Sequence, residues 1–547
     1  MNFNKVKIVA FLNKIEPYYF YLFTIINLLP VIAFKFFLIG DGPAHLYNSR
    51  LILELLNNNI FITDYFQFNQ LSPNWFGHII LAVFLNFFPA FIAEKILILF
   101  YLIGFPLSFR ALIKQLPFNN RAMFYFVFPF TYSFLFYLGM YNFHLGLVFF
   151  FWALALFIKY KQQYNFKRIV ILLILSTLIC LSHIFTFAIF ILVILIFNLS
   201  LLKTLINSDL KTRLFNFKKI GNQILFLFPS IILMLNFIFT KVDSNKSDLV
   251  YVSPWTLLNW IIQIQPAKAV NYAKEGIFTR WILYLFLLII IYLIAIKIFP
   301  LIFKEKQVNK IKPISSSYNW LFFSISSIIL MFILPDGNSA FGFISSRLLL
   351  FFFLFLIVWL ATQHFPLWLG IISFLIINYM NLALLKIYFV STKNSNNISL
   401  SINEAANHIK PNSIILPLNY SDNMLFNHAS NYLGIEKPLV ILENYEATLN
   451  YFPLKWNINT IPNLIISNTN NCLNFPKNER NKKKYIDYIF ILTGNEKDSS
   501  YQCEDDIKNI LNSNYHLEYN NGDKTVLLYK LENKNQKSIL TGMLKTE

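Results

Sequence analysis

The sequence predicts an all-α polytopic membrane bundle of about eleven transmembrane helices, followed by a C-terminal soluble α/β domain. Hydrophobic residues make up 56% of the 547 residues and charged residues only 13%, which is more apolar surface than a soluble core needs. Apolar runs long enough to cross a bilayer alternate with short basic segments. From residue 391 the composition becomes mixed and polar. The expected domains are therefore 1–390, with a first external loop at 39–91, and 391–547.

The net charge of +19 indicates topology and not nucleic-acid binding. Positive residues cluster between apolar runs, as membrane orientation requires, whereas the C-terminal region mixes both signs. Lysines precede the first run, which lacks a small-residue cleavage site and reads as a retained anchor. We therefore expect a multi-pass protein of a bacterial inner (cytoplasmic) membrane. Its N-terminus would be cytoplasmic and its C-terminal domain extracytoplasmic.

The first predicted span, Tyr18–Leu38, leads directly into a polar stretch that contains Asp41, His45 and Arg50. An acid placed there lies at the boundary between water and lipid, where ionisable groups are costly and usually functional. The Gly42-Pro43 pair breaks the helix, so Asp41 should lie on a fixed turn. The plainer alternative is that Asp41 only caps the helix that follows.

The apolar piece Trp75–Phe88 is short for a span and is bounded by prolines. Counting it as a span would place the next basic turn outside, against the charge rule. We read it as a part-buried helix of the first external loop.

The other predicted spans follow from apolar runs with basic segments on the cytoplasmic side. They are Ile92–Leu112, Met123–Leu138, Leu145–Ile158, Ile169–Leu181, Ile184–Leu202, Ile224–Phe239, Phe278–Phe299, Trp320–Leu334, Leu348–Thr362 and Leu367–Leu385. With the spans alternating in direction, one set of polar residues falls on the external face together with Asp41: Asn142, His144, His183, Asp336 and Arg347.

In the C-terminal region, short apolar runs predict buried strands, and a run broken by Asn521-Gly522-Asp523 predicts a hairpin. The strands are Ser413–Leu418, Leu439–Leu442 and Tyr488–Leu492, the hairpin is Leu517–Leu531, and Glu504–Leu511 reads as a helix.

Several side chains of this tail have two readings. Cys472 and Cys503 could form a disulfide if the tail is exported. His428 with Tyr432, and the Tyr445-Glu446 pair, could contact an acceptor, although satisfied surface or core positions are the commoner role.

The arrangement resembles the GT-C superfamily of polytopic glycosyltransferases over about residues 10 to 390. The resemblance rests on the acid after the first span (Asp41), the long first loop, the short second external loop, and a base that opens a late span (Arg347). It implies a polyprenyl-phosphate-linked sugar as donor and Asp41, with His45, as the catalytic pair. Arg347 and His183 would hold the donor phosphate.

Three further residues of the external face are candidates for donor binding: Asn142, His144 and Arg50. The alternative is helix packing for Asn142 and His144, and a surface or headgroup contact for Arg50. The second external loop offers no carboxylate, so a two-acid metal site is not expected. A divalent Mg or Mn ion, if one is used, would be held by Asp41 with histidines.

The expected function is transfer of a sugar from a polyprenyl-phosphate donor to a glycan, lipid or protein acceptor, among membrane lipids and without nucleic acid. A flippase or transporter would carry charges in mid-span, and most predicted spans have almost none. An O-antigen polymerase or ligase would use arginines in a large external loop, but 241–275 has lysines and no arginine. A bundle of this size is also more than an anchor needs.

Overall fold

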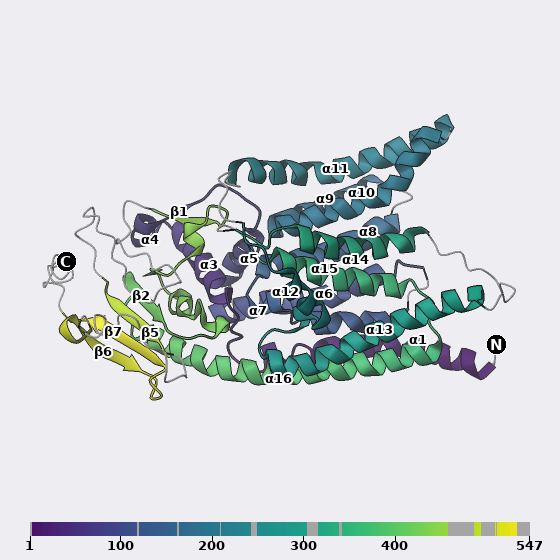
Figure 1. Ribbon diagram of the computed structural model, residues 1–547. Coiled ribbons are helices and arrows are strands. Elements are labelled where there is room, and N and C mark those ends of the chain that lie inside the picture. The colour runs from purple at the N-terminus through teal and green to yellow at the C-terminus, as the bar shows by residue number, and fades with distance from the viewer. Residues whose placement is uncertain are drawn as a thin grey trace. The chain divides into compact units, whose positions relative to one another are not determined.

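The computed structural model describes residues 3–117, 120–160, 164–207, 209–241, 249–302, 315–338, 342–457, 486–493, 509 and 511–532. The chain is a polytopic helical membrane protein with a strand-containing C-terminal domain (Figure 1), which confirms the predicted fold class. It divides into two compact units. Unit 1 contains residues 1–30, 99–137 and 142–391, and unit 2 contains residues 31–98, 138–141 and 392–547.

Unit 1 is built from helices. They are α1 (Phe3–Ile26), η1 (Arg121–Phe130), α7 (Phe134–Tyr137), α8 (Tyr141–Tyr160, whose first residue belongs to unit 2), α9 (Phe166–Ser182), α10 (Ile184–Asn207), α11 (Leu210–Lys241), α12 (Pro254–Ile262), η2 (Gln265–Ala267), α13 (Tyr272–Ile302), α14 (Ser315–Ile333) and α15 (Ile344–Ala361). Three other helices contribute residues to both units: α2 (Leu29–Ile32), α6 (Ala90–Ile113) and α16 (Leu367–Asn407).

Among the described residues, seven helices are long and apolar enough to cross a membrane. These stretches are Lys14–Ile32, Ala90–Ile113, Tyr141–Tyr160, Leu210–Thr240, Tyr272–Ile296, Ile344–Ala361 and Leu367–Asn407, and shorter apolar helices occupy Phe76–Leu85, Ile184–Asn198 and Ser317–Ile333.

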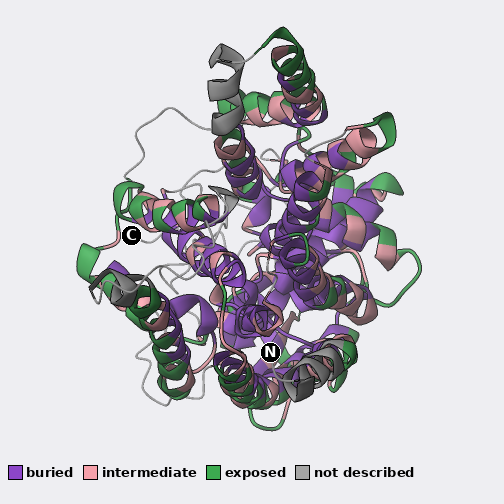
Figure 2. Cartoon of the chain, turned by 90° about the vertical axis from the view of Figure 1, so that its right-hand side faces the viewer, coloured by how far each residue is buried: buried purple, intermediate pink, exposed green. Residues whose placement is uncertain are grey.

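The helices of unit 1 differ in how far their residues are buried, and Figure 2 colours each residue of the chain by its burial. The apolar stretch of α8 is 89% buried, whereas that of α11 is only 22% buried. The exposed side of α11 carries large apolar side chains, including Leu225, Phe228 and Phe239. An apolar surface of this extent is stable against lipid chains and not against water.

The structure differs from the sequence prediction over Met123–Leu138. This stretch is the 3₁₀ helix η1 followed by the short α7, and not a spanning α-helix. Pro129 cannot donate a backbone hydrogen bond within η1, and the Asn120 side chain accepts from the amide of Ala122 at its start. All residues from Met123 to Phe130 are buried, so this apolar run fills the protein interior.

The last spanning helix also differs, because α16 continues to Asn407 instead of ending at Leu385. Its polar extension is held by tertiary contacts: Asn396 accepts a hydrogen bond from the Phe36 amide at 2.9 Å, and Ser399 is fully buried. These contacts outweigh the low helix propensity of Ser and Asn.

Unit 2 contains a five-stranded sheet. Its order is β3 (Leu439–Ile441), β2 (Ser413–Asn419), β5 (Tyr488–Leu492), β7 (Val526–Leu531) and β6 (Tyr515–Asn520). Strand β2 is parallel to β3 and β5, while β7 is antiparallel to β5 and β6. The three predicted buried strands and the predicted hairpin are confirmed. Cys472, Cys503 and most of the predicted helix Glu504–Leu511 lie outside the described residues.

Unit 2 also contains the first loop, which packs with the tail. The loop forms α3 (Gly42–Leu56), α4 (Ile60–Tyr65), β1 (Phe66–Phe68) and α5 (Phe76–Leu85), and the tail adds η3 (Met424–Phe426), η4 (Ala429–Gly434), η5 (Glu446–Thr448) and β4 (Leu454–Trp456). Strand β1 pairs with β4, and Phe66 stacks on Trp456 with ring centroids 4.3 Å apart. The Tyr47 hydroxyl donates to the Leu439 carbonyl at 2.7 Å. Helix α5 confirms that Trp75–Phe88 forms a short helix of the loop.

Candidate functional site

Asp41 lies on a rigid turn at the start of α3. It occupies the N-cap position, but its side chain makes no capping hydrogen bond. Its amide donates to the Leu138 carbonyl at 2.9 Å. Gly139 has φ +91°, and a Cβ there would lie 2.4 Å from the Asp41 nitrogen, so only glycine fits. The geometry therefore does not support the plain capping role, and the carboxylate is available for another contact.

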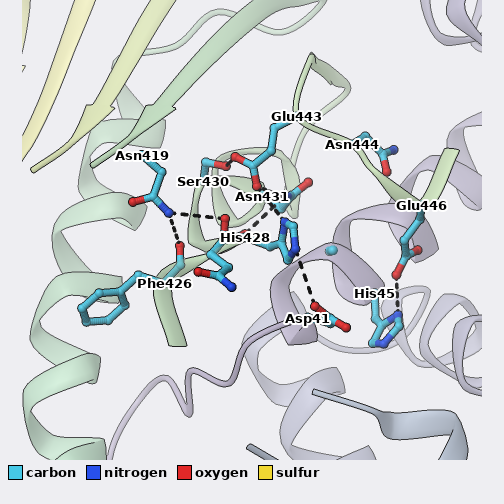
Figure 3. A network of polar contacts seen from close by, with 12 residues as sticks. Asp41, His45, Asn419, Phe426, His428, Ser430, Asn431, Glu443, Asn444 and Glu446 are labelled. Carbon is cyan, nitrogen blue, oxygen red and sulfur yellow. Dashed lines mark hydrogen bonds and ion pairs between the residues drawn. The ribbon is translucent and has the colours of Figure 1, made fainter. Parts of the chain in front are cut away.

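That contact is with His428, from the turn before η4. Asp41 Oδ1 lies 3.6 Å from His428 Nε2, and His428 Nδ1 lies 2.9 Å from Glu443 Oε1 (Figure 3). Glu443 is itself held by the Ser430 hydroxyl and by the Asn431 side-chain amide. Because Glu443 accepts from Nδ1, the other ring nitrogen of His428 is directed at Asp41. The three residues form an aligned Asp–His–Glu chain.

Tyr445 closes one side of this chain. Its ring stacks on His428 with centroids 4.4 Å apart and planes 28° apart, and its side chain hydrogen-bonds Asp41. Burial raises the pKa of Asp41, against the lowering effect of His428 and His45. Burial alone would lower the pKa of His428, but Glu443 and Asp41 outweigh it and the pKa is raised. Asp41 is thus a stronger base than a solvated aspartate, held beside an imidazole that favours its protonated form.

A second cluster lies one helical turn along α3. His45 Nδ1 is 2.5 Å from Glu446 Oε1 and 3.1 Å from His78 Nε2, and His78 Nε2 is 2.9 Å from Glu446 Oε2. The three side chains come from α3, α5 and η5, and all are buried. Among the described residues, this is the group of three whose ligand atoms lie close enough to hold a metal ion, all within 4.8 Å of one another.

The charges of this cluster are strongly coupled. Burial would raise the pKa of Glu446, but His45 and His78 hold that pKa down at about 2. Burial would lower the pKa of His45, but Glu446 and Asp41 raise it overall. Burial lowers the pKa of His78, with Glu446 opposing. A carboxylate therefore persists here, facing two imidazoles.

A buried acid braces the Asp41 turn from the side. Glu94, in α6, accepts hydrogen bonds from the hydroxyls of Tyr141 at 2.8 Å and Tyr432 at 2.9 Å. A Cβ added at Gly42 would lie 3.0 Å from Glu94 Oε1, so the turn approaches this acid closely. Both oxygens of Glu94 are satisfied, which suits a structural role.

The predicted site residues fall into both units. Asp41 and His45 lie together in unit 2, where Arg50 pairs with Glu54 at 2.8 Å. The other predicted residues, Asn142, His144, His183 and Arg347, belong to unit 1.

Within unit 1, Phe143 lies between two of the predicted phosphate ligands. Its ring contacts His183 with centroids 5.2 Å apart, and the Arg347 guanidinium lies 5.7 Å from its centre. The His144 ring also contacts Phe143, with centroids 5.3 Å apart, while its Nε2 lies 3.1 Å from the Ser133 hydroxyl. The structure thus groups His183, Arg347 and His144 around Phe143, and both Arg347 and His144 interact electrostatically with His183.

Sequence reasoning missed His78 and Glu443, and treated Glu446 only as a possible acceptor contact. One signal was available for the acids, since both follow the buried strand β3, and functional side chains gather at the carboxyl ends of parallel strands. A single histidine in the otherwise apolar helix α5 was the signal for His78.

Comparisons with known proteins give little further guidance. No family model matches the sequence, and no curated protein matches it. Among solved structures, the chain is similar to a crystal structure of ArnT from Cupriavidus metallidurans in the apo state. The match covers 93% of this chain and 97% of that chain at 12% identity and a TM-score of 0.39. This similarity is too low to assign the chain to the family of that protein.

Proposed function

We propose that the chain is an integral membrane glycosyltransferase. It transfers a sugar from a polyprenyl-phosphate-linked donor to a hydroxyl of a glycan, lipid or protein acceptor, on the external face of a bacterial inner membrane. The observation that carries the proposal is the Asp41–His428–Glu443 arrangement in the first loop and the tail, in which burial raises the pKa of Asp41 and Glu443 orients His428 toward it. The resemblance of the sequence to GT-C glycosyltransferases supports the choice of reaction.

Asp41, oriented by His428 and Glu443, is suited to remove a proton from an acceptor hydroxyl. A hydroxyl is a poor nucleophile, and a carboxylate within hydrogen-bond reach takes its proton in the transition state. The acceptor oxygen bonds to the anomeric carbon, the bond from that carbon to the donor phosphate breaks, and the proton passes to Asp41. The polyprenyl phosphate leaves with the bonding electrons. His428 holds the Asp41 carboxylate in place, and Glu443 fixes the orientation of His428.

Arg347 and His183 are our candidates for the donor phosphate. Both lie against Phe143, and an arginine suits a phosphate because its planar fork makes two charge-assisted hydrogen bonds. Asn142 remains a candidate for donor binding on sequence grounds only, whereas His144 also contacts Phe143. Arg50 is a weaker candidate because Glu54 already pairs with it.

The placement of the charged groups favours an enzyme over a transporter. The members of the two clusters belong to the first loop and the C-terminal region: Asp41, His45, His78, His428, Glu443 and Glu446. A polyprenyl-glycan transporter would need its polar groups along mid-span paths.

The test compares cells that carry the wild-type chain, Asp41→Asn or Asp64→Asn at matched membrane levels. Asp64 is an exposed acid of α4 in the same loop and serves as the control. We expect mass spectrometry of the envelope glycans to show one sugar missing in Asp41→Asn alone, with its lipid-linked donor accumulating. An unchanged glycan profile in Asp41→Asn would refute the proposal.

A further inference from the structure

His45, His78 and Glu446 converge on one point with the geometry of a metal site. The distances between their facing ligand atoms are 2.5, 2.9 and 3.1 Å. A tetrahedral zinc ion with bonds of about 2.0–2.1 Å separates its ligand atoms by roughly 3.3 Å. These distances join four atoms, because His45 faces Oε1 of Glu446 and His78 faces Oε2. To reach about 3.3 Å, the two nitrogens and the His78–Oε2 pair would have to separate by a few tenths of an ångström, and the His45–Oε1 pair by about 0.8 Å.

Hydrogen bonding alone explains the cluster poorly. His45 Nδ1 and His78 Nε2 face each other, and both face the carboxylate of Glu446. If both facing nitrogens are protonated, they repel each other; if only one is, the pair shares a single proton beside a buried carboxylate. A divalent cation bound to two neutral imidazoles and the carboxylate satisfies all three lone pairs at once.

The surroundings of the two histidines match those of metal ligands. The outer edge of His45 has a hydrogen bond to the backbone of Gly139, whereas the outer nitrogen of His78, Nδ1, is buried near the backbone of Asn74 without a well-aligned hydrogen bond. Such outer contacts fix the tautomer and the direction of ligating imidazoles. Phe452 covers both rings, at 6.1 Å from His45 and 5.5 Å from His78, and shields the cluster from solvent.

The donor set selects the metal. Two imidazole nitrogens and one carboxylate suit zinc, whereas Mg and Mn prefer oxygen ligands in octahedral sites. Three protein ligands also leave a fourth position open for water, as in catalytic zinc sites. The sequence suggests Asp41 as the ligand of a Mg or Mn ion. The cluster one helical turn along α3 is a better metal site, and its ligands favour zinc.

We propose that His45, His78 and Glu446 bind one zinc ion, which fixes η5 against α3 and α5. Glu446 directly follows Tyr445, whose ring stacks on His428 and whose side chain hydrogen-bonds Asp41. A metal that holds Glu446 thereby also holds Tyr445 and positions the Asp41–His428 pair. The zinc site is inferred from its own ligands and does not depend on the proposed sugar transfer.

The test measures bound metal on the purified full-length chain in detergent. The wild type, His78→Gln, Glu446→Gln and His516→Gln are equilibrated with equal concentrations of zinc, manganese and magnesium salts, desalted, and analysed by elemental mass spectrometry. His516 is a control because it is 43% exposed on β6, where it pairs with Glu518. We expect one zinc per chain in the wild type and His516→Gln, and none above background in the other two.

Two measurements on the wild type keep the result decisive if a variant folds poorly. Competition with a chromophoric chelator gives the zinc affinity directly, and cobalt(II) should give the visible absorption of a tetrahedral site. Zinc should also raise the thermal unfolding midpoint of the wild type. A wild type that binds no zinc, that binds manganese or magnesium in preference, or that loses no zinc in His78→Gln and Glu446→Gln would overturn the proposal.

Discussion

Replacing His428 by glutamine should move the acid side of the pH–rate profile to higher pH. Asp41 must be deprotonated to act as a base, so transfer falls as the pH drops through the pKa of Asp41. The raised pKa of His428 favours its protonated form beside Asp41. Its positive charge lowers the pKa of Asp41, and its loss lets that pKa rise.

The size of the effect follows from the separation of 3.6 Å between Asp41 Oδ1 and His428 Nε2. At an effective dielectric constant of about 20, two unit charges at that distance attract by about 4–5 kcal/mol, which is an upper bound. The Asp41 side chain is 31% exposed, so water screens part of this attraction. The movement of the profile to higher pH should therefore be smaller than this upper bound implies.

The assay uses membranes from cells that carry Asp41→Asn as the source of both substrates. The lipid-linked donor and the unmodified acceptor should accumulate in these membranes. Purified wild type, His428→Gln and the exposed control His516→Gln are compared for kcat/KM between pH 4 and pH 9 by mass spectrometry of the product. His428→Gln should show the upward movement and His516→Gln should follow the wild type. An acid side that stays in place, or moves to lower pH, in His428→Gln would refute the role of His428.

Three other changes test the supporting structure. Gly139→Ala places a side chain at φ +91°, with its Cβ 2.4 Å from the Asp41 nitrogen. The free energy of unfolding should fall by about 2 kcal/mol or more, measured as a lower thermal midpoint, and transfer should be lost. Tyr432→Phe removes the 2.9 Å hydrogen bond to Glu94 and leaves a buried carboxyl oxygen without this donor. It should lower the free energy of unfolding by about 1–3 kcal/mol in a urea titration, and an unchanged midpoint would argue against a structural role of this bond. The raised pKa of His428 contributes stability at pH below its unfolded pKa, and this is lost as the pH rises through the folded pKa. The thermal midpoints of the wild type and His428→Gln should therefore differ most at acid pH and converge at alkaline pH.

The fold was largely predictable where one local signal dominated. The apolar runs of α6 and α13 are long enough to span a bilayer. The short strands β2, β3 and β5 are apolar along most of their length because they are buried on both faces. Hydropathy gave the wrong prediction where proline or long-range contacts determined the secondary structure.

Two particular stretches show why. Met123–Phe130 is as apolar as a span, but proline and tight packing make it a buried 3₁₀ helix. The end of α16 is polar and has weak helix propensity, yet it continues because Asn396 and Ser399 are held by the rest of unit 2. Neither contact is visible in the local sequence.

The candidate site could be predicted only in part, because some of its residues show a local sequence signal and the others depend on long-range contacts. Asp41 stands out because it is an acid directly after a long apolar run, and His45 follows it by one turn. Their partners His428, Glu443 and Glu446 lie more than 380 residues further along the chain. Only the pairing of the first loop with the tail, as between β1 and β4, brings them together.

The measurement that tests the central claim most directly is a double-variant comparison on the purified chain. Single-turnover rates are measured for the wild type, Asp41→Asn, His428→Gln and the variant that carries both changes. Loss of a general base should slow transfer by about a hundredfold or more. Because His428 acts through Asp41, we expect the double variant to be no slower than Asp41→Asn alone. A double variant slowed by the product of the two single effects, or full activity in Asp41→Asn, would contradict the account.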